Sequence, residues 1–65
     1  MKAYMITTFC HDSYSYSGVE PDEHFFFLSQ EKAIEHAKNN NLILVDGCVD
    51  DPDKEARLEE ITIIE

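Results

Sequence analysis

Two cysteines and three histidines are the residues of this chain that could bind a metal ion. Thiolate and imidazole groups suit zinc and other borderline metals. Their spacing does not, because the sequence contains no C-x2-C or H-x3-H pair, and His36 is expected on the exposed face of a helix. We therefore predict no metal site, and ordinary thiols and solvated histidines at Cys10, His11, His24, His36 and Cys48.

The acids between positions 46 and 55 could instead form a calcium loop. An EF-hand loop needs acids at alternate positions, a central glycine and a glutamate at its twelfth position. Counted from Asp51, the sixth position is Ala56 and the twelfth is Thr62, so the pattern fails. A solvated loop that caps a following helix is the favoured interpretation.

Nucleophilic catalysis would need a thiol beside a histidine, and the residue types allow Cys10 with His24. A chain of 65 residues leaves little room for a shaped substrate pocket. A glycine-rich phosphate loop is absent, since the only glycines are Gly18 and Gly47. We predict that the protein is not an enzyme and needs no cofactor.

Net charge is the strongest global signal. Fourteen acids face five bases, which gives a formal net charge of −9. Such a chain repels nucleic-acid phosphates and anionic membranes, and its field favours basic protein surfaces. The alternative is that the acids form a solubilising coat. One small domain of this length has a marginal core, which makes self-association an expectation.

The first residues, MKAYMITTF, lack the apolar region of a secretory signal, and no run approaches the length of a membrane span. We expect a cytoplasmic protein whose two cysteines are reduced.

Hydrophobic periodicity predicts a strand–loop–strand–helix–strand order, closed by a final strand. Ser29 suits a helix N-cap, the asparagines of residues 39–41 suit its end, and Pro52 suits the first position of a short helix. The expected fold is one α+β domain, in which a mainly antiparallel sheet of three or four strands carries one main helix on one face. The expected strands are residues 2–9, 24–28, 42–46 and 60–64, the expected main helix is residues 30–40, and residues 52–59 are expected as either a loop or a short helix.

The segment CHDSYSYSGVEPDEHFFF combines a hairpin loop, expected over residues 10–23, with a core strand. Alternatively, the alternating serines and tyrosines of SYSYS extend the hairpin, since such side chains can pair across strands. In the core strand Phe26 points away from Phe25 and Phe27, so one face packs on the helix and the other needs a cover. The cover is either the loop or a second chain. Tyr14 and Tyr16 either anchor such an interface or hold the loop to the sheet.

The phrases YMITTF, FFLSQEKAIEHAKNN and LEEITIIE, read in this order, make the chain resemble a broad set of short phage and bacterial proteins. These open with a strand and a hairpin, carry a phrase like F-x-S-x-E-K-A before the helix, and end in an acidic strand. The resemblance implies an α+β fold and a phage origin, and it carries over no catalytic residue. Short acidic phage proteins often bind and block a host protein, including defence systems.

Our first hypothesis is a small acidic binding protein that docks on a basic surface of a host protein in the host cytoplasm. If that partner handles nucleic acid, the acids would act as a DNA mimic. A structural homodimer that associates through its apolar face is the alternative, and a metal or thiol enzyme ranks last. The residues expected to contact the partner are Tyr14, Tyr16, Glu20, Asp22, Glu23, Asp50, Asp51, Asp53, Glu55, Glu59 and Glu60.

Overall fold

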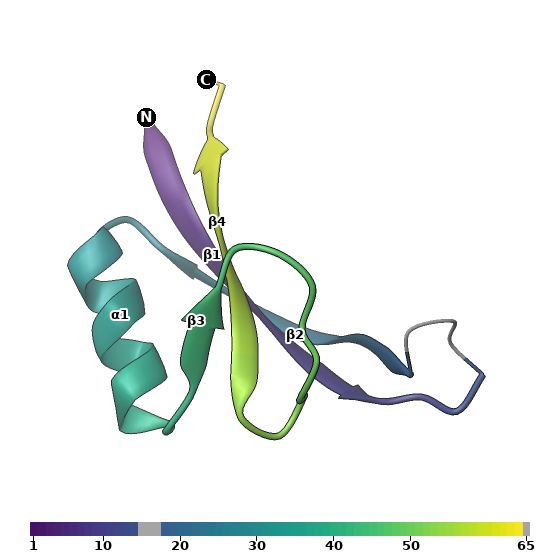
Figure 1. The fold of residues 1–65 in the computed structure, drawn as a ribbon. Coiled ribbons are helices and arrows are strands. Elements are labelled where there is room, and N and C mark those ends of the chain that lie inside the picture. Colours follow the sequence, from purple (N-terminus) through teal and green to yellow (C-terminus); the bar gives the residue numbers. More distant parts are fainter. Residues whose placement is uncertain (15–17, 65) are drawn as a thin grey trace.

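A four-stranded sheet with one helix packed against it makes up the computed structural model, which describes residues 1–14 and 18–64. The strands lie in the order β2-β1-β4-β3 (Figure 1). β1 pairs antiparallel with β2 and with β4, whereas β3 pairs parallel with β4. The α+β class predicted from the sequence is confirmed. The elements are β1 Lys2–His11, β2 Val19–Phe27, α1 Gln30–Asn39, β3 Ile43–Val45 and β4 Glu55–Thr62.

β1 occupies the centre of the sheet, as its apolar residues on both faces predicted. Its neighbouring residues Ile6 and Thr7 are both fully buried, although their side chains lie on opposite faces. The sheet therefore needs a cover on each side of β1.

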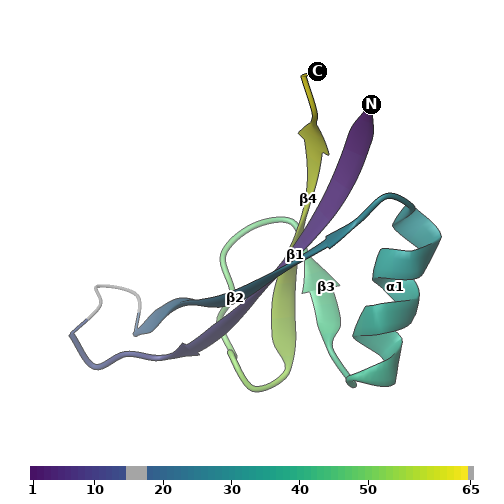
Figure 2. The ribbon, with the colours of Figure 1, turned by 180° about the vertical axis from the view of Figure 1, so that it is seen from behind.

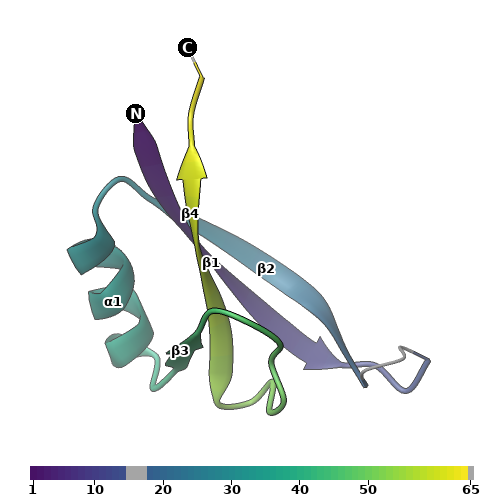
Figure 3. The same cartoon turned by 45° about the horizontal axis from the view of Figure 1, so that its top comes forward.

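The hairpin loop expected over residues 10–23 is shorter than predicted, because the two strands of the hairpin extend into it. β1 continues to His11, and β2 begins at Val19. Pro21 and the acids beside it are typical of turns. An edge strand nevertheless tolerates proline, because a residue whose N–H would point away from the sheet needs no hydrogen-bond donor. The hairpin extends away from α1 (Figure 3).

A bulge interrupts this hairpin, because Thr7 pairs with His24 whereas Phe9 pairs with Pro21. Two residues of β2 thus lie opposite Thr8. The Thr8 hydroxyl accepts a hydrogen bond from the N–H of Glu23 at 3.2 Å and donates one to its carbonyl at 3.5 Å. The threonine side chain therefore replaces the ladder hydrogen bonds that the bulge removes.

Helix α1 begins after Ser29, the predicted N-cap, whose side chain makes no capping hydrogen bond. Glu31 lies in the first turn, where its charge complements the helix dipole. Ala33 and Ala37 are buried one turn apart, and their small side chains let the helix approach the sheet closely.

The asparagine run ends α1 as predicted. Asn41 adopts a φ of 57°, in the left-handed region, directly after the C-cap Asn40. The N–H of Leu42 donates to the carbonyl of Ala37 at 2.8 Å, and that of Asn41 donates to Lys38 at 3.1 Å. This pair of bonds is the Schellman motif, which pairs carbonyls left open at the helix end.

The short helix expected as one alternative for residues 52–59 does not exist, because Glu55–Thr62 is strand β4. Only a single turn forms, in which the N–H groups of Lys54 and Glu55 donate to the carbonyl of Asp51 at 3.1 and 2.9 Å. Pairing with β1 on one side and β3 on the other overrides the helix-start signal of Pro52. The last strand was expected at residues 60–64, so it begins five residues earlier and ends two earlier than predicted. β3 spans the centre of the strand expected at 42–46.

The two faces of the sheet are covered differently. On the helix face, α1 closes a core of four fully or almost fully buried residues: Ile6, Ala33, Ala37 and Ala56. On the opposite face, the loop of residues 46–54 crosses the sheet, in front of it in Figure 1 and behind it in Figure 2. Val49 and Pro52 of this loop are buried, so the loop forms a second, smaller cover.

Candidate partner-binding surface

The thiols and imidazoles lie in separate places. His36 is half-buried against the rings of Phe25 and Phe27, with ring centroids 4.9 and 5.2 Å away, so the exposed position expected for it is wrong. His24 Nδ1 is hydrogen-bonded to the hydroxyl of Thr7 at 3.0 Å. Across residues 1–14 and 18–64, no three side chains of the metal-binding types come together as a ligand set.

Cys10 is half-buried on the hairpin, and its thiol donates a hydrogen bond to Glu20 Oε1 at 3.5 Å. Desolvation raises the pKa of Cys10 above its ordinary value, and the Glu20 hydrogen bond and charge raise it further, as do the charges of Asp22 and Asp12. The thiol is therefore held in its protonated, weakly nucleophilic form. Glu20 lies opposite Cys10 in the β1–β2 ladder, so its carboxylate lies at the hairpin stem.

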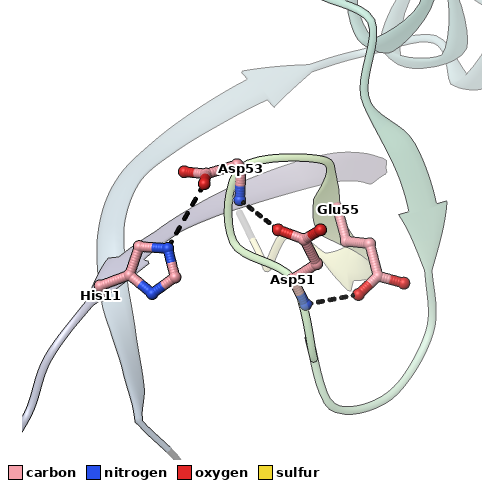
Figure 4. Close-up of polar contacts among 4 residues, drawn as sticks. All are labelled: His11, Asp51, Asp53 and Glu55. Carbon is pink, nitrogen blue, oxygen red and sulfur yellow. Dashed lines mark hydrogen bonds and ion pairs between the residues drawn. The ribbon is translucent and has the colours of Figure 1, made fainter.

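Two of the acids predicted to contact a partner, Asp51 and Glu55, form hydrogen bonds within the protein instead. One carboxylate oxygen of Glu55 accepts hydrogen bonds from the N–H groups of Asp50, at 3.0 Å, and of Asp51, at 2.9 Å. Figure 4 shows the bond from Asp51. Asp51 Oδ1 accepts from the N–H of Asp53 at 3.1 Å. These bonds hold the loop of residues 46–54 in shape, so the side chains of Asp51 and Glu55 stabilise the loop.

Three further acids have a cationic or imidazole neighbour. Glu59 forms an ion pair with the Nε of Arg57 at 2.6 Å, and Glu60 pairs with the Nζ of Lys2 at 2.8 Å. The Glu60 hydrogen bond and charge raise the pKa of Lys2. Asp53 lies 3.4 Å from His11 Nε2, a contact that joins the loop to the hairpin (Figure 4).

Three of the predicted contact acids keep exposed side chains that make no hydrogen bond or ion pair within the described part of the chain: Asp22, Glu23 and Asp50. Two of them lie on β2, the edge strand of the sheet. Glu20 lies on the same strand, and its carboxylate accepts a hydrogen bond from the thiol of Cys10. Residues 3–31 contain no lysine or arginine, so the hairpin supplies no basic side chain of its own to offset these acids.

Of the two tyrosines expected as anchors, the structure describes only Tyr14. Tyr14 is 98% exposed after the end of β1, and its N–H donates to Asp12 Oδ1 at 2.9 Å in the hairpin turn. Its ring therefore does not hold the loop to the sheet. Tyr16 lies outside the described residues.

Phe26 is an exposed aromatic residue on the same strand as Asp22 and Glu23. It is 65% exposed on the face of β2 opposite to α1, whereas its neighbours Phe25 and Phe27 pack against the helix-side core. The sequence predicted this alternation and a second face that needs a cover other than the helix, and the loop of residues 46–54 leaves Phe26 exposed. The sequence did not reveal the exposed Ile43 of β3, or the structural role of Glu55, because both depend on how distant segments pair.

A shallow hollow of about 260 Å³ lies between the hairpin stem and the loop of residues 46–54. The guanidinium of Arg57 stacks over the ring of Phe9 beside it, 5.4 Å from the centroid. The buried Nε of Arg57 has no aligned hydrogen-bond acceptor within the described residues, although Glu59 balances its charge. The residues lining the hollow are Phe9, Val19, Pro21, Cys48, Val49 and Arg57.

Comparison of the chain with protein-family models, with curated proteins and with solved structures finds no significant match. Within the described ranges, no helix is both long and apolar enough to cross a membrane.

Proposed function

We propose that this protein is a small acidic binding protein that docks on a basic surface of another protein and modulates that partner. The observation that carries the proposal is the set of exposed, unneutralised acids on the β1–β2 hairpin: Glu20, Asp22 and Glu23. These carboxylates stabilise the fold through no ion pair. The repulsion between like charges on one strand lowers the stability of the fold. A basic partner surface would offset this repulsion.

The partner is a host protein, because the chain resembles short phage proteins. A host protein that handles nucleic acid presents a basic surface of the required kind, and the hairpin acids would occupy it in place of phosphates. Binding of that sort inhibits the partner by competition with its nucleic acid.

The test is capture of partners from a host lysate by the tagged full-length chain, with washes at low and high salt, followed by mass spectrometry. We expect one basic protein that is retained at low salt and released at high salt, since salt screens exposed charges. If the captured protein binds nucleic acid, added chain should displace that nucleic acid.

A matched pair of variants makes the test specific to the hairpin. Asp22→Asn with Glu23→Gln removes two charges from β2, and Glu31→Gln with Glu35→Gln removes two from α1. We expect only the hairpin variant to lose the partner. Equal retention by both variants, or an empty capture at both salt concentrations, would contradict docking through the hairpin.

The homodimer remains a second candidate, because Phe26 and Ile43 expose apolar surface on the same face of the sheet. It predicts a sedimentation mass of two chains that high salt does not lower, since an apolar interface resists salt. A single-chain mass would exclude it.

A further inference from the structure

The two edges of the sheet differ in what they offer to another chain. β3 is an edge of three residues, Ile43–Val45, and so short an edge gives little template for pairing. β2 is an edge of nine residues, Val19–Phe27, with only β1 beside it (Figures 1 and 3). Half of the backbone groups along β2 therefore point away from the sheet.

Only the second half of β2 is a regular edge. In the first half, Pro21 lacks an N–H, and the bulge at Asp22 and Glu23 bends the strand. From His24 to Phe27 the pairing with β1 runs without interruption. Proline and bulges are the devices that protect an edge from unwanted pairing, and residues 24–27 carry neither.

The side chains along this half of β2 indicate the kind of chain that would pair there. Phe26 is 65% exposed and lies on the face that α1 does not cover. Asp22 and Glu23 lie earlier on the same strand, separated from Phe26 by His24 and Phe25, and β2 contains no lysine or arginine. A second copy pairing at this edge would bring these acids near those of another chain of net charge −9. The charge therefore favours a basic segment over a second copy.

We propose that the edge of β2 at residues 24–27 receives an extended basic segment of the partner protein as a fifth strand. The inference rests on the proposed function and names the place and the manner of docking. Main-chain hydrogen bonds to the edge supply the affinity common to strand addition. An apolar side chain of the incoming segment packs beside Phe26, and its lysines or arginines lie near Asp22 and Glu23.

The first experiment uses a short fluorescent peptide that alternates lysine with valine, and measures its binding to the full-length chain by anisotropy. Two matched peptides keep every charge but carry N-methyl groups, one on all valine amides and the other on all lysine amides. Each blocks hydrogen bonding along one edge of the peptide. We expect one of the two to lose at least about tenfold in affinity, which is the loss of roughly one good hydrogen bond to the edge.

Amide hydrogen exchange of the chain locates the bound peptide. We expect slower exchange at residues 24–27 and little change along β3. Equal binding of all three peptides, or no added protection at residues 24–27, would overturn strand addition. Docking by charge would still stand if the lysate partner is retained at low salt, so the two proposals fail separately.

A pair of variants tests the role of Phe26. Phe26→Ala removes the exposed ring beside the acids, and Ile43→Ala removes a similarly exposed apolar side chain, 60% exposed, from the other edge. We expect Phe26→Ala to weaken peptide binding about tenfold, as truncation of an aromatic anchor does, and Ile43→Ala to leave it unchanged. The same loss with both variants, or with neither, would contradict an anchor at Phe26.

Discussion

The two faces of the sheet show how differently one strand can be used on its two sides. On the helix face, Ile6 meets two alanines of α1 in a closed apolar core. On the loop face, the equally buried Thr7 is hydrogen-bonded to His24, and the cover is an irregular loop anchored by Glu55. Most of the buried apolar residues thus lie on the helix face. The loop face leaves Phe26 exposed, and this ring is available for contact with another chain.

The largest expected effect follows from changing Ile6. Ile6→Ala should lower the free energy of unfolding by about 2–5 kcal/mol, because it leaves a cavity at a fully buried site. A chain this short has only about 3–5 kcal/mol in total, so the variant should be largely unfolded. Thr7→Val keeps the shape of the side chain and removes one hydrogen bond, so it should lower the free energy of unfolding by about 1 kcal/mol. Urea unfolding followed by circular dichroism measures both, and equal losses would contradict the difference between the faces.

Two neighbouring phenylalanines provide the next comparison. Phe25→Ala should cost about 1–3 kcal/mol of unfolding free energy, less than a fully buried phenylalanine, since Phe25 is half-buried against the core and His36. Phe26→Ala should stay within about 0.5 kcal/mol because its ring is mostly solvated. Thermal and urea unfolding report the difference. A large loss with Phe26→Ala would show that its face is covered in solution.

The anchoring of the loop is expected to be worth less than the core. Glu55→Ala should lower the unfolding free energy by about 1–3 kcal/mol, because the N–H groups of Asp50 and Asp51 lose a charged acceptor. Amide exchange should also quicken around Val49. Glu23→Ala removes an exposed carboxylate and is the control, expected within about 0.5 kcal/mol. Equal stabilities would mean that Glu55 does not hold the loop.

The smallest effect concerns Cys10. Glu20→Gln removes a charge that raises the thiol pKa and replaces a charged hydrogen-bond acceptor by a neutral one, so the pKa of Cys10 should fall. More thiolate is then present at a given alkaline pH, and alkylation of Cys10 by iodoacetamide should quicken. Peptide mass mapping separates Cys10 from the exposed Cys48, and Glu31→Gln on the helix is the control. An unchanged rate at Cys10 would show that Glu20 does not act on the thiol.

Local signals in the sequence were sufficient to predict the central strand and the helix. Ile6 and its neighbours alternate between faces, and a strand with apolar groups on both faces belongs in the centre of a sheet. The helix ends where Asn41 takes the left-handed conformation, a property of the residue itself. The alternation around Phe26 likewise predicted that its side chain lies on the face opposite to the helix, since this follows from strand geometry alone.

Tertiary structure decided what these local signals left open. Residues 55–59 follow a helix-start signal, yet pairing with β1 and β3 makes them a strand, because ladder hydrogen bonds and the burial of Ala56 outweigh a weak local preference. Likewise, sequence treats the acids as equivalent, and only their placement shows that Glu55 holds a loop while Asp22 and Glu23 remain unpaired at an edge. Composition determined the negative charge, and strand pairing decided which of the acids are free to meet a partner.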